Sequence, residues 1–241
     1  MKPLFFYCFT YLGLVLALFS QTAAAQADEP ENGFKSIFDG KTLQGWQVTP
    51  EKFKQAGTVE EGAIVGNGDR GRCYLEYHQK SIANFELKFS YQFPGKGNSG
   101  VSIRARPDPT GKRHYQSYHA DLGHVGIGKN ILGAWDFHTP GRREHACFRG
   151  DRLVIDVNDQ PTITKIPGAV TLADIKKNGW NQVHVTANDN HFKFSINGKM
   201  SAEFIEHLQP EKRLDQGTLQ LQLHDPGMVV KFKDIRLKIL K

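Results

Sequence analysis

The chain has little cysteine. Three cysteines occur in 241 residues, and Cys8 lies in an apolar N-terminal run, which leaves Cys73 and Cys147. There is no C-x-x-C pair, so neither a zinc knuckle nor a dithiol redox motif is indicated. A disulfide between Cys73 and Cys147 would need Cα atoms within about 7 Å of each other. Two buried free thiols are an equally good alternative.

The sequence also lacks the short motifs of several large enzyme classes. It has no G-x-S-x-G nucleophile elbow, no P-loop and no dinucleotide fingerprint. No cofactor is therefore evident. Two closely spaced carboxylates of a glycosidase dyad are missing from any single strand-like segment, although such a pair can come from different strands.

Charge of one sign does not cluster. The chain carries 31 Lys+Arg against 25 Asp+Glu, a net charge of +6, and the basic residues are scattered apart from Arg70/Arg72 and Arg142/Arg143. A nucleic-acid-binding protein is expected to show a basic stripe or patch. We therefore expect no nucleic-acid partner.

Only one long apolar run is present, and it lies at the N-terminus. Lys2 precedes the apolar residues 4–19, and Ala23, Ala24 and Ala25 follow. This order of charge, apolar core and small residues predicts a signal peptide over residues 1–25. A membrane span needs roughly 20 apolar residues, and no basic stop follows the run. We expect export to the periplasm or the extracellular space, with no stable membrane anchor.

The remaining sequence reads as one domain. Residues 26–33 are polar with Pro and Gly and predict a flexible lead-in. Residues 34–241 are sufficient for a single large β-sandwich. We see no internal repeat and no low-complexity tract.

Long helical patterns are absent, and alternation of period two dominates. Apolar residues alternate with polar ones over residues 85–93, 152–158, 192–196, 219–224 and 232–239. Asn197-Gly198 is a strong hairpin signal, and the alternation breaks near Lys233-Asp234, which predicts a bulge. Only residues 172–177 resemble a helix, of one or two turns. The pattern predicts an all-β, antiparallel sandwich.

Two strand-like segments carry polar rows that would line one face of a sheet. Gly100, Ser102 and Arg104 alternate with apolar neighbours after Asn98. Arg104 would offer a planar fork to a carboxylate or a polarised oxygen, and its alternative is a surface ion pair.

The second row contains Tyr115, Ser117, His119 and Asp121. In a His–carboxylate unit, Asp121 would orient the His119 imidazole for proton transfer. The alternative is a structural hydrogen bond between the two side chains.

A third row and one irregular segment complete the candidates. Thr218, Gln220, Gln222 and His224 share one strand face, and amides suit the paired donors and acceptors of sugar hydroxyls; a plain polar sheet face is the alternative. Within 133–149, Trp135 is a candidate platform for a sugar ring or a core residue, and Arg142 is a candidate substrate contact.

No metal signature appears in the sequence, but a divalent metal stays open. Its candidate ligands are among His119, Asp121, His124, His138, His145 and His224.

Seven short segments, taken in order, resemble one known family. FKSIFDGKTLQGW at residues 34–46 resembles the start of the 3-keto-disaccharide hydrolase domain family, and GNSGV through Arg104 resembles an internal motif of it. The other matching segments are residues 84–87, 118–121, 179–181 and 196–198, and one two-part segment at 217–224 and 230–236. The resemblance covers about residues 34–240.

That resemblance implies a concanavalin A-like jelly roll that acts on glycosides with a ketone at C3. The ketone acidifies the C2 hydrogen, so a base and an oxyanion stabiliser would permit elimination at C1 followed by hydration. The resemblance implies that Arg104 would stabilise the ketone or enolate oxygen. The proton transfer would fall to His119 with Asp121, or to His224. Expected substrate contacts are Asn98, Ser102, Trp135, Arg142, Gln220 and Gln222.

The expected partner is a carbohydrate. The protein is expected to be a glycoside-cleaving hydrolase, and two alternatives stay open. The first is a non-catalytic carbohydrate-binding sandwich; the second is an adhesion or scaffold module, which would need an exposed apolar patch. Convergence of Arg104, His119, Asp121 and His224 in one groove would favour the enzyme.

Overall fold

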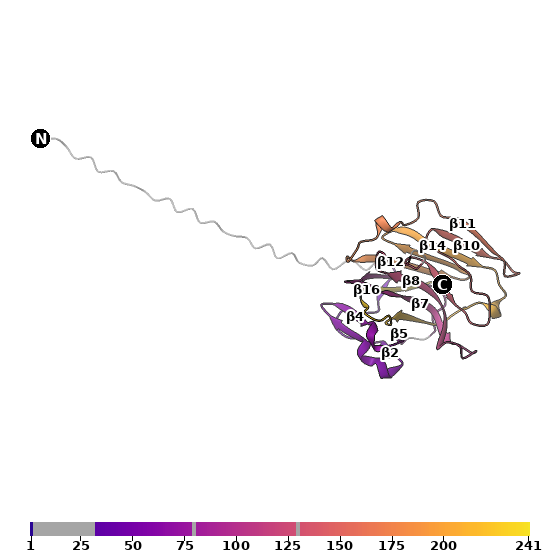
Figure 1. The fold of residues 1–241 in the computed structure, drawn as a ribbon, viewed down its shortest axis with the longest axis horizontal. Coiled ribbons are helices and arrows are strands. Elements are labelled where there is room, and N and C mark those ends of the chain that lie inside the picture. The colour runs from indigo at the N-terminus through magenta and orange to yellow at the C-terminus, as the bar shows by residue number, and fades with distance from the viewer. Residues whose placement is uncertain (2–31, 79–80, 129–130) are drawn as a thin grey trace. The chain divides into compact units, whose positions relative to one another are not determined.

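Two stacked β-sheets make up the domain (Figure 1). The computed structural model describes Met1 and residues 32–78, 81–128 and 131–241, and within them residues 32–241 form one compact unit. The predicted signal peptide, apart from Met1, and positions 26–31 of the predicted lead-in lie outside the described residues. No helix in the described part of the chain is long and apolar enough to cross a membrane.

The larger sheet has ten strands among the described residues, and every neighbouring pair is antiparallel except β10 and β14. Its order is β11 (Pro161–Lys165), β10 (Asp151–Ile155), β14 (Lys199–Glu206), β13 (His191–Ile196), β12 (Asn181–Asn188), β6 (Phe85–Gln92), β16 (Val229–Ile239), β4 (Ala63–Asn67) and β3 (Gly57–Glu60), with β1 (Lys35–Ser36) paired to β16.

The smaller sheet has six strands in the described ranges and carries the polar rows. Its order is β2 (Trp46–Thr49), β5 (Tyr74–Tyr77), β15 (Thr218–Gln222), β7 (Asn98–Pro107), β8 (Tyr115–Gly123) and β9 (Trp135–His138). All of its pairs are antiparallel. The predicted all-β sandwich is confirmed.

Helical structure is confined to short 3-10 segments. They are η1 (Glu51–Ala56), η2 (Gly68–Arg70), η3 (Leu172–Asp174) and η4 (Pro210–Lys212). The segment predicted as one or two helical turns is the single turn η3, which Thr171 and Asp174 cap reciprocally.

Local turn chemistry follows the sequence. Asn197 and Gly198 both have positive φ, 50° and 79°, as a two-residue hairpin between β13 and β14 requires. The register of β16 against β6 shifts between Lys233 and Arg236, which confirms the bulge predicted from the broken alternation.

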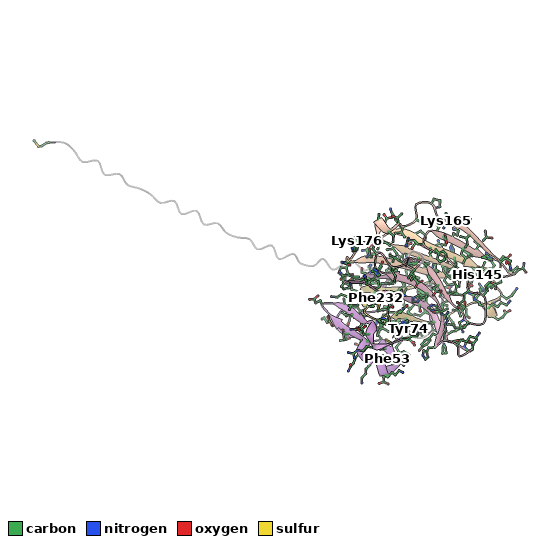
Figure 2. The ribbon with its side chains drawn as sticks, viewed as in Figure 1. Phe53, Tyr74, His145, Lys165, Lys176 and Phe232 are labelled. Atoms are coloured by element: carbon green, nitrogen blue, oxygen red, sulfur yellow. The ribbon has the colours of Figure 1, made fainter. Side chains whose placement is uncertain are left out.

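An aromatic cluster fills the space between the sheets. Tyr118 and Phe137 from the smaller sheet contact Phe192 and Phe204 from the larger, with Phe192 and Phe204 stacked at 4.2 Å between ring centroids. Burying such rings is the main apolar contribution to stability. Figure 2 shows Phe53 near the bottom of the domain and Lys165 near its top, with side chains throughout the space between them.

Both cysteines are buried free thiols on different strands or loops of this core. Burial raises the pKa of Cys73 to about 11 and that of Cys147 to about 12. The disulfide alternative is therefore not the one that the structure adopts.

Candidate functional site

Strand register gathers the polar rows on the outer face of the smaller sheet. Ser102 on β7 is opposite His119 on β8 and Gln220 on β15. His119 is in turn opposite Asp136 on β9, and Gln220 is opposite Glu76 on β5. Since side chains opposite each other share a face, residues far apart in the sequence form one polar rung across five strands.

This face is hollowed into a polar pocket of about 270 Å³. Three of the four residues predicted to be catalytic line it, namely His119, Asp121 and His224. The remaining lining residues are Arg72, Tyr74, Asn98, Arg113, His114, Tyr115, Asp136, His138 and Gln222.

His119 lies at the bottom of the pocket, with only 1% of its side chain exposed. Its Nδ1 is hydrogen-bonded to Ser102 Oγ at 2.9 Å. Its ring lies against Gly100, where an added Cβ would be 2.2 Å from Nε2, and stacks on the His138 ring at 5.0 Å. The absent side chain of Gly100 therefore creates the space that the imidazole occupies.

Asp121 lies closer to the opening than His119 does. Its side chain is 14% exposed, and its Oδ1 is 3.5 Å from His119 Nε2, which has no hydrogen-bond partner among the described residues. Burial, with a smaller contribution from the Asp136 carboxylate, raises the pKa of Asp121 to about 8. Burial, reinforced by the charge of His138, lowers the pKa of His119 to about 3. At neutral pH the imidazole is neutral and the carboxyl is mostly protonated.

Asp136 and His138 form a second pair on β9. His138 Nε2 and Asp136 Oδ2 are 2.9 Å apart. Burial alone would raise the pKa of Asp136, but the hydrogen bond from His138 and the charges of His138 and Arg113 outweigh it and lower the pKa to about 2. The pocket thus holds two carboxyl groups whose pKa values are driven in opposite directions.

His224 closes the pocket beside β5. Its ring lies edge-on to Tyr74 at 5.4 Å between centroids, and Tyr74 is labelled in Figure 2. Burial, followed by the charge of Arg72, lowers the pKa of His224 to about 4. His224 is a neutral donor or acceptor at physiological pH.

The predicted amide contacts lie on the same face at different depths. Gln222 lines the pocket and donates from Nε2 to the His224 carbonyl at 3.1 Å. Gln220 is 1% exposed and donates to Glu76 Oε2 at 2.8 Å, so it supports the floor. Asn98 lines the pocket, and its buried Oδ1 has no partner among the described residues.

Arg104, the fourth predicted catalytic residue, lies elsewhere. The register of β7 shifts between Ile103 and Arg106, and Arg104 has φ 49°. This bulge turns the side chain off the pocket face, since one extra residue reverses the alternation. The guanidinium stacks 4.8 Å over Phe192, and it donates hydrogen bonds of 2.8–3.1 Å to Ala83 O, Asp189 O, Leu214 O and Asn84 Oδ1. Arg104 ties the two sheets together.

Two other predicted contacts also lie away from the pocket. Trp135 is 2% exposed, packs among core phenylalanines and donates from Nε1 to Ala202 O at 3.2 Å. Arg142 Nη1 is 2.7 Å from Glu206 Oε2, and its guanidinium lies 5.7 Å from the ring of Tyr118. Both residues therefore lie on the core side of the smaller sheet, where they contact the larger sheet.

The sequence pattern does not reveal the cationic and aromatic wall of the pocket. Arg72 stands out only as half of a basic pair, and Tyr74, Arg113 and His114 form no pattern of their own. These side chains come together because the segment around 106–114 folds back toward β5, and the alternation of polar and apolar residues does not predict that path.

The histidines are distributed more widely than a single ligand set would be. His124 is hydrogen-bonded to the backbone of Gly97, and His145 Nε2 is 2.6 Å from Asp159 Oδ1. Over residues 32–78, 81–128 and 131–241, no group of three or more His, Cys, Asp or Glu side chains has an arrangement that could hold a metal ion.

The chain belongs to the 3-keto-alpha-glucoside-1,2-lyase-like domain family, whose model matches residues 33–238. It is also similar to a 3-keto-disaccharide hydrolase of Bacteroides thetaiotaomicron, with 30% identity over 82 residues. That match spans 31% of this chain and 28% of the relative's length. The family resemblance seen in the sequence is confirmed.

Solved structures with the same fold include both enzymes and a binding module. A candidate glycosyl hydrolase from Parabacteroides distasonis has a TM-score of 0.57 at 20% identity, covering 87% of this chain and 94% of its own. The carbohydrate-binding module CBM66 from Bacillus subtilis has 0.51 at 15%, covering 80% and 95%. A kappa-carrageenase from Pseudoalteromonas carrageenovora has 0.51 at 12%, covering 90% and 99%. These likenesses establish the concanavalin A-like jelly-roll fold. The reaction has to be inferred from the residues of the pocket.

Proposed function

We propose that this protein is an exported enzyme that cleaves the glycosidic bond of 3-keto-glycosides by elimination and hydration. The observation that carries the proposal is the Asp121 carboxyl, whose pKa is raised to about 8, facing a polar pocket beside neutral His119. The family match supports a sugar substrate. A group whose pKa is near the working pH is effective in general acid–base catalysis.

In this proposal Asp121 is the residue that moves the proton. It is the more exposed member of its pair, while His119 lies beneath His138. The carboxylate form of Asp121 removes the C2 hydrogen that the C3 ketone acidifies. His119, whose Nε2 lies 3.5 Å from Asp121 Oδ1, then acts as a positioning residue behind the carboxyl group. This reverses the arrangement in which an aspartate orients a histidine base.

The other side chains supply donors for the developing charge. Removal of the C2 proton places negative charge on the C3 oxygen, and donors already held in place stabilise such an oxyanion. Arg113, His138 and Asn98 line the same pocket and supply these donors in place of Arg104, which lies outside it. As the enolate collapses, the C1–O bond breaks and the leaving oxygen takes a proton; water then adds across C1 and C2.

The separation of the two carboxyl pKa values supports distinct roles. Asp121 is mostly protonated at neutral pH, whereas Asp136 is ionised and hydrogen-bonded to His138 at 2.9 Å. Pairs of titratable groups driven apart in this way identify acid and base partners in many active sites. His138, oriented by Asp136, is the candidate proton donor to the leaving group.

The experiment is incubation of the purified protein with 3-keto-trehalose and with 3-keto-glucosides, with free sugar measured as product. Turnover by the wild type, lost in Asp121→Asn, supports the proposal. Solvent deuterium incorporated at C2 of the product distinguishes elimination from direct hydrolysis. No sugar release across several such substrates would exclude the activity.

A non-catalytic carbohydrate-binding role is the second outcome of the same experiment. Gln222 and the unpaired Asn98 Oδ1 in the pocket suit sugar hydroxyls without any chemistry. In that case the wild type gives no turnover, and a His119→Ala/Asp121→Asn double variant still binds the sugar in calorimetry.

Export is proposed from the leader alone. Residues 1–25 have the order of a cleavable signal peptide. Sequencing the N-terminus of the protein recovered from outside the cytoplasm should give a chain that starts at Gln26. An intact N-terminus in the cytoplasm would contradict this proposal.

A further inference from the structure

A second pocket of about 140 Å³ adjoins the polar one. The two share one wall, made of Arg72, Tyr74, His114 and Tyr115. A molecule bound in the polar pocket therefore meets the second pocket without crossing the core. A cavity of roughly 150 Å³ is large enough to hold a benzene ring, so one flat ring fits the second pocket.

The chemistry of the second pocket differs from that of the first. Its lining outside the shared wall is Thr49, Pro50 and Pro107, with none of the carboxyl groups that line the polar pocket. Tyr74 and Tyr115 stand edge to face at 6.2 Å between centroids. Proline and tyrosine rings offer flat apolar surface, which favours an aromatic or flat ring over a hydroxyl-rich one.

The shared wall carries positive charge. Arg72 is exposed, and no ion pair or hydrogen bond of its side chain is found among the described residues. Arg113, by contrast, is paired with Glu144 at 3.3 Å. Arg72 is the largest charge acting on both Tyr74 and His224, which places its guanidinium near the junction of the two pockets. A guanidinium fork binds carboxylate and similar anions with two parallel hydrogen bonds.

We propose that the second pocket is the subsite for the leaving half of the substrate, and that it takes a flat, acidic aglycone whose anionic group pairs with Arg72. This inference rests on the proposed function, because it assigns the sugar to the polar pocket. The substrate class is a 3-keto-glucoside of an aromatic acid. The apolar walls contact the ring, and Arg72 selects the charge.

The test compares two aryl substrates of the same shape, one with an anionic para group and one with a neutral para group. The 4-carboxyphenyl and 4-carbamoylphenyl 3-keto-glucosides, in both anomers, are assayed for kcat/KM. We expect the wild type to prefer the carboxylate by about fivefold, the size expected for a solvent-accessible ion pair, and the preference to fall in high salt. Arg72→Gln should bring the ratio close to one, and Arg72→Lys should leave part of it.

Arg70→Gln is the matched control. Arg70 is exposed two residues away and lines neither pocket, so the same change of net charge should leave the wild-type ratio intact. A wild type without preference, or equal losses in Arg70→Gln and Arg72→Gln, would overturn the inference while turnover itself upholds the proposed function.

If no 3-keto-glucoside is cleaved, the subsite is tested by binding. Titration with 4-hydroxybenzoate and with 4-hydroxybenzamide, followed by NMR shifts, should show tighter binding of the benzoate in the wild type and no difference in Arg72→Gln. Equal binding of the two compounds by the wild type would then exclude the acidic subsite independently of catalysis.

Discussion

Gly100 on β7 is the position at which one methyl group should disrupt the site. A Cβ built there lies 2.2 Å from His119 Nε2, 2.6 Å from the Ala120 carbonyl and 2.7 Å from His119 Cε1. Ordinary contact needs about 3.4 Å, so in Gly100→Ala the imidazole must move by about 1 Å. The Ala120 carbonyl is backbone and yields little.

The displacement has two measurable effects. Overpacking of this kind costs about 1–3 kcal/mol, which for a domain of this size corresponds to a fall in Tm of roughly 2–12 °C. A shift of about 1 Å near reacting groups reduces kcat about a hundredfold. Thermal unfolding and release of sugar from a 3-keto-glucoside measure the two effects on the same preparation.

Gly95→Ala is the matched control, because no atom lies within 4 Å of a Cβ built at Gly95. It should retain both Tm and turnover. If Gly100→Ala also keeps its Tm within a degree and its activity within threefold, the imidazole does not occupy the space above Gly100, and the assignment of the pocket floor is refuted.

Three further predictions concern other parts of the domain. First, the raised pKa of Asp121, about 8, means that its base form accumulates as pH rises, so kcat/KM should increase up to about pH 8 and Asp121→Asn should lose it by a hundredfold or more. The same shift lowers the wild type's free energy of unfolding as pH rises from about 4 to 8, since burial disfavours the charged form; Asp121→Asn should lack that slope in Tm. Second, Arg104→Met should lower the free energy of unfolding by about 3–5 kcal/mol, because it leaves several buried carbonyl acceptors without a donor. It should not move the pH profile of kcat/KM of the folded protein; a shifted profile would place Arg104 in the chemistry. Third, Cys73 and Cys147, with pKa values raised to about 11 and 12, should react with a thiol reagent only after denaturation; reaction of the native protein would contradict their burial.

The strands were predictable because apolar alternation reports directly which side of a sheet a residue faces. The hairpin at Asn197-Gly198 and the bulge near Lys233 are also predictable, because each depends on a few neighbouring residues. His119 and Asp121 could be placed on one face for the same reason. Their proximity to His224 depends on the pairing of β7 with both β8 and β15, which alternation within one strand does not determine.

The position of Arg104 does not follow from the alternation pattern. The residues around it continue an unbroken alternation of apolar and polar positions, so the sequence predicts an outward side chain. The bulge between Ile103 and Arg106 lies where the pairing of β7 with β15 also shifts. These are pairings between strands, which the alternation within one strand does not report. Trp135 poses the same problem, because a large aromatic residue in an irregular segment is equally suited to a platform and to a core.

Neighbouring residues of strand β8 point to opposite faces of the smaller sheet, one into the core and the next into the pocket. His119 lies between Tyr118 and Ala120, both fully buried on the opposite side of the sheet. Any drift in the packing of Tyr118 against the larger sheet therefore tilts the histidine at the bottom of the pocket. Variation among descendants of this chain should be restricted along β8 and tolerated along β2 and the 106–114 turn, so that new substrates are acquired at the rim of the domain while its centre is inherited unchanged.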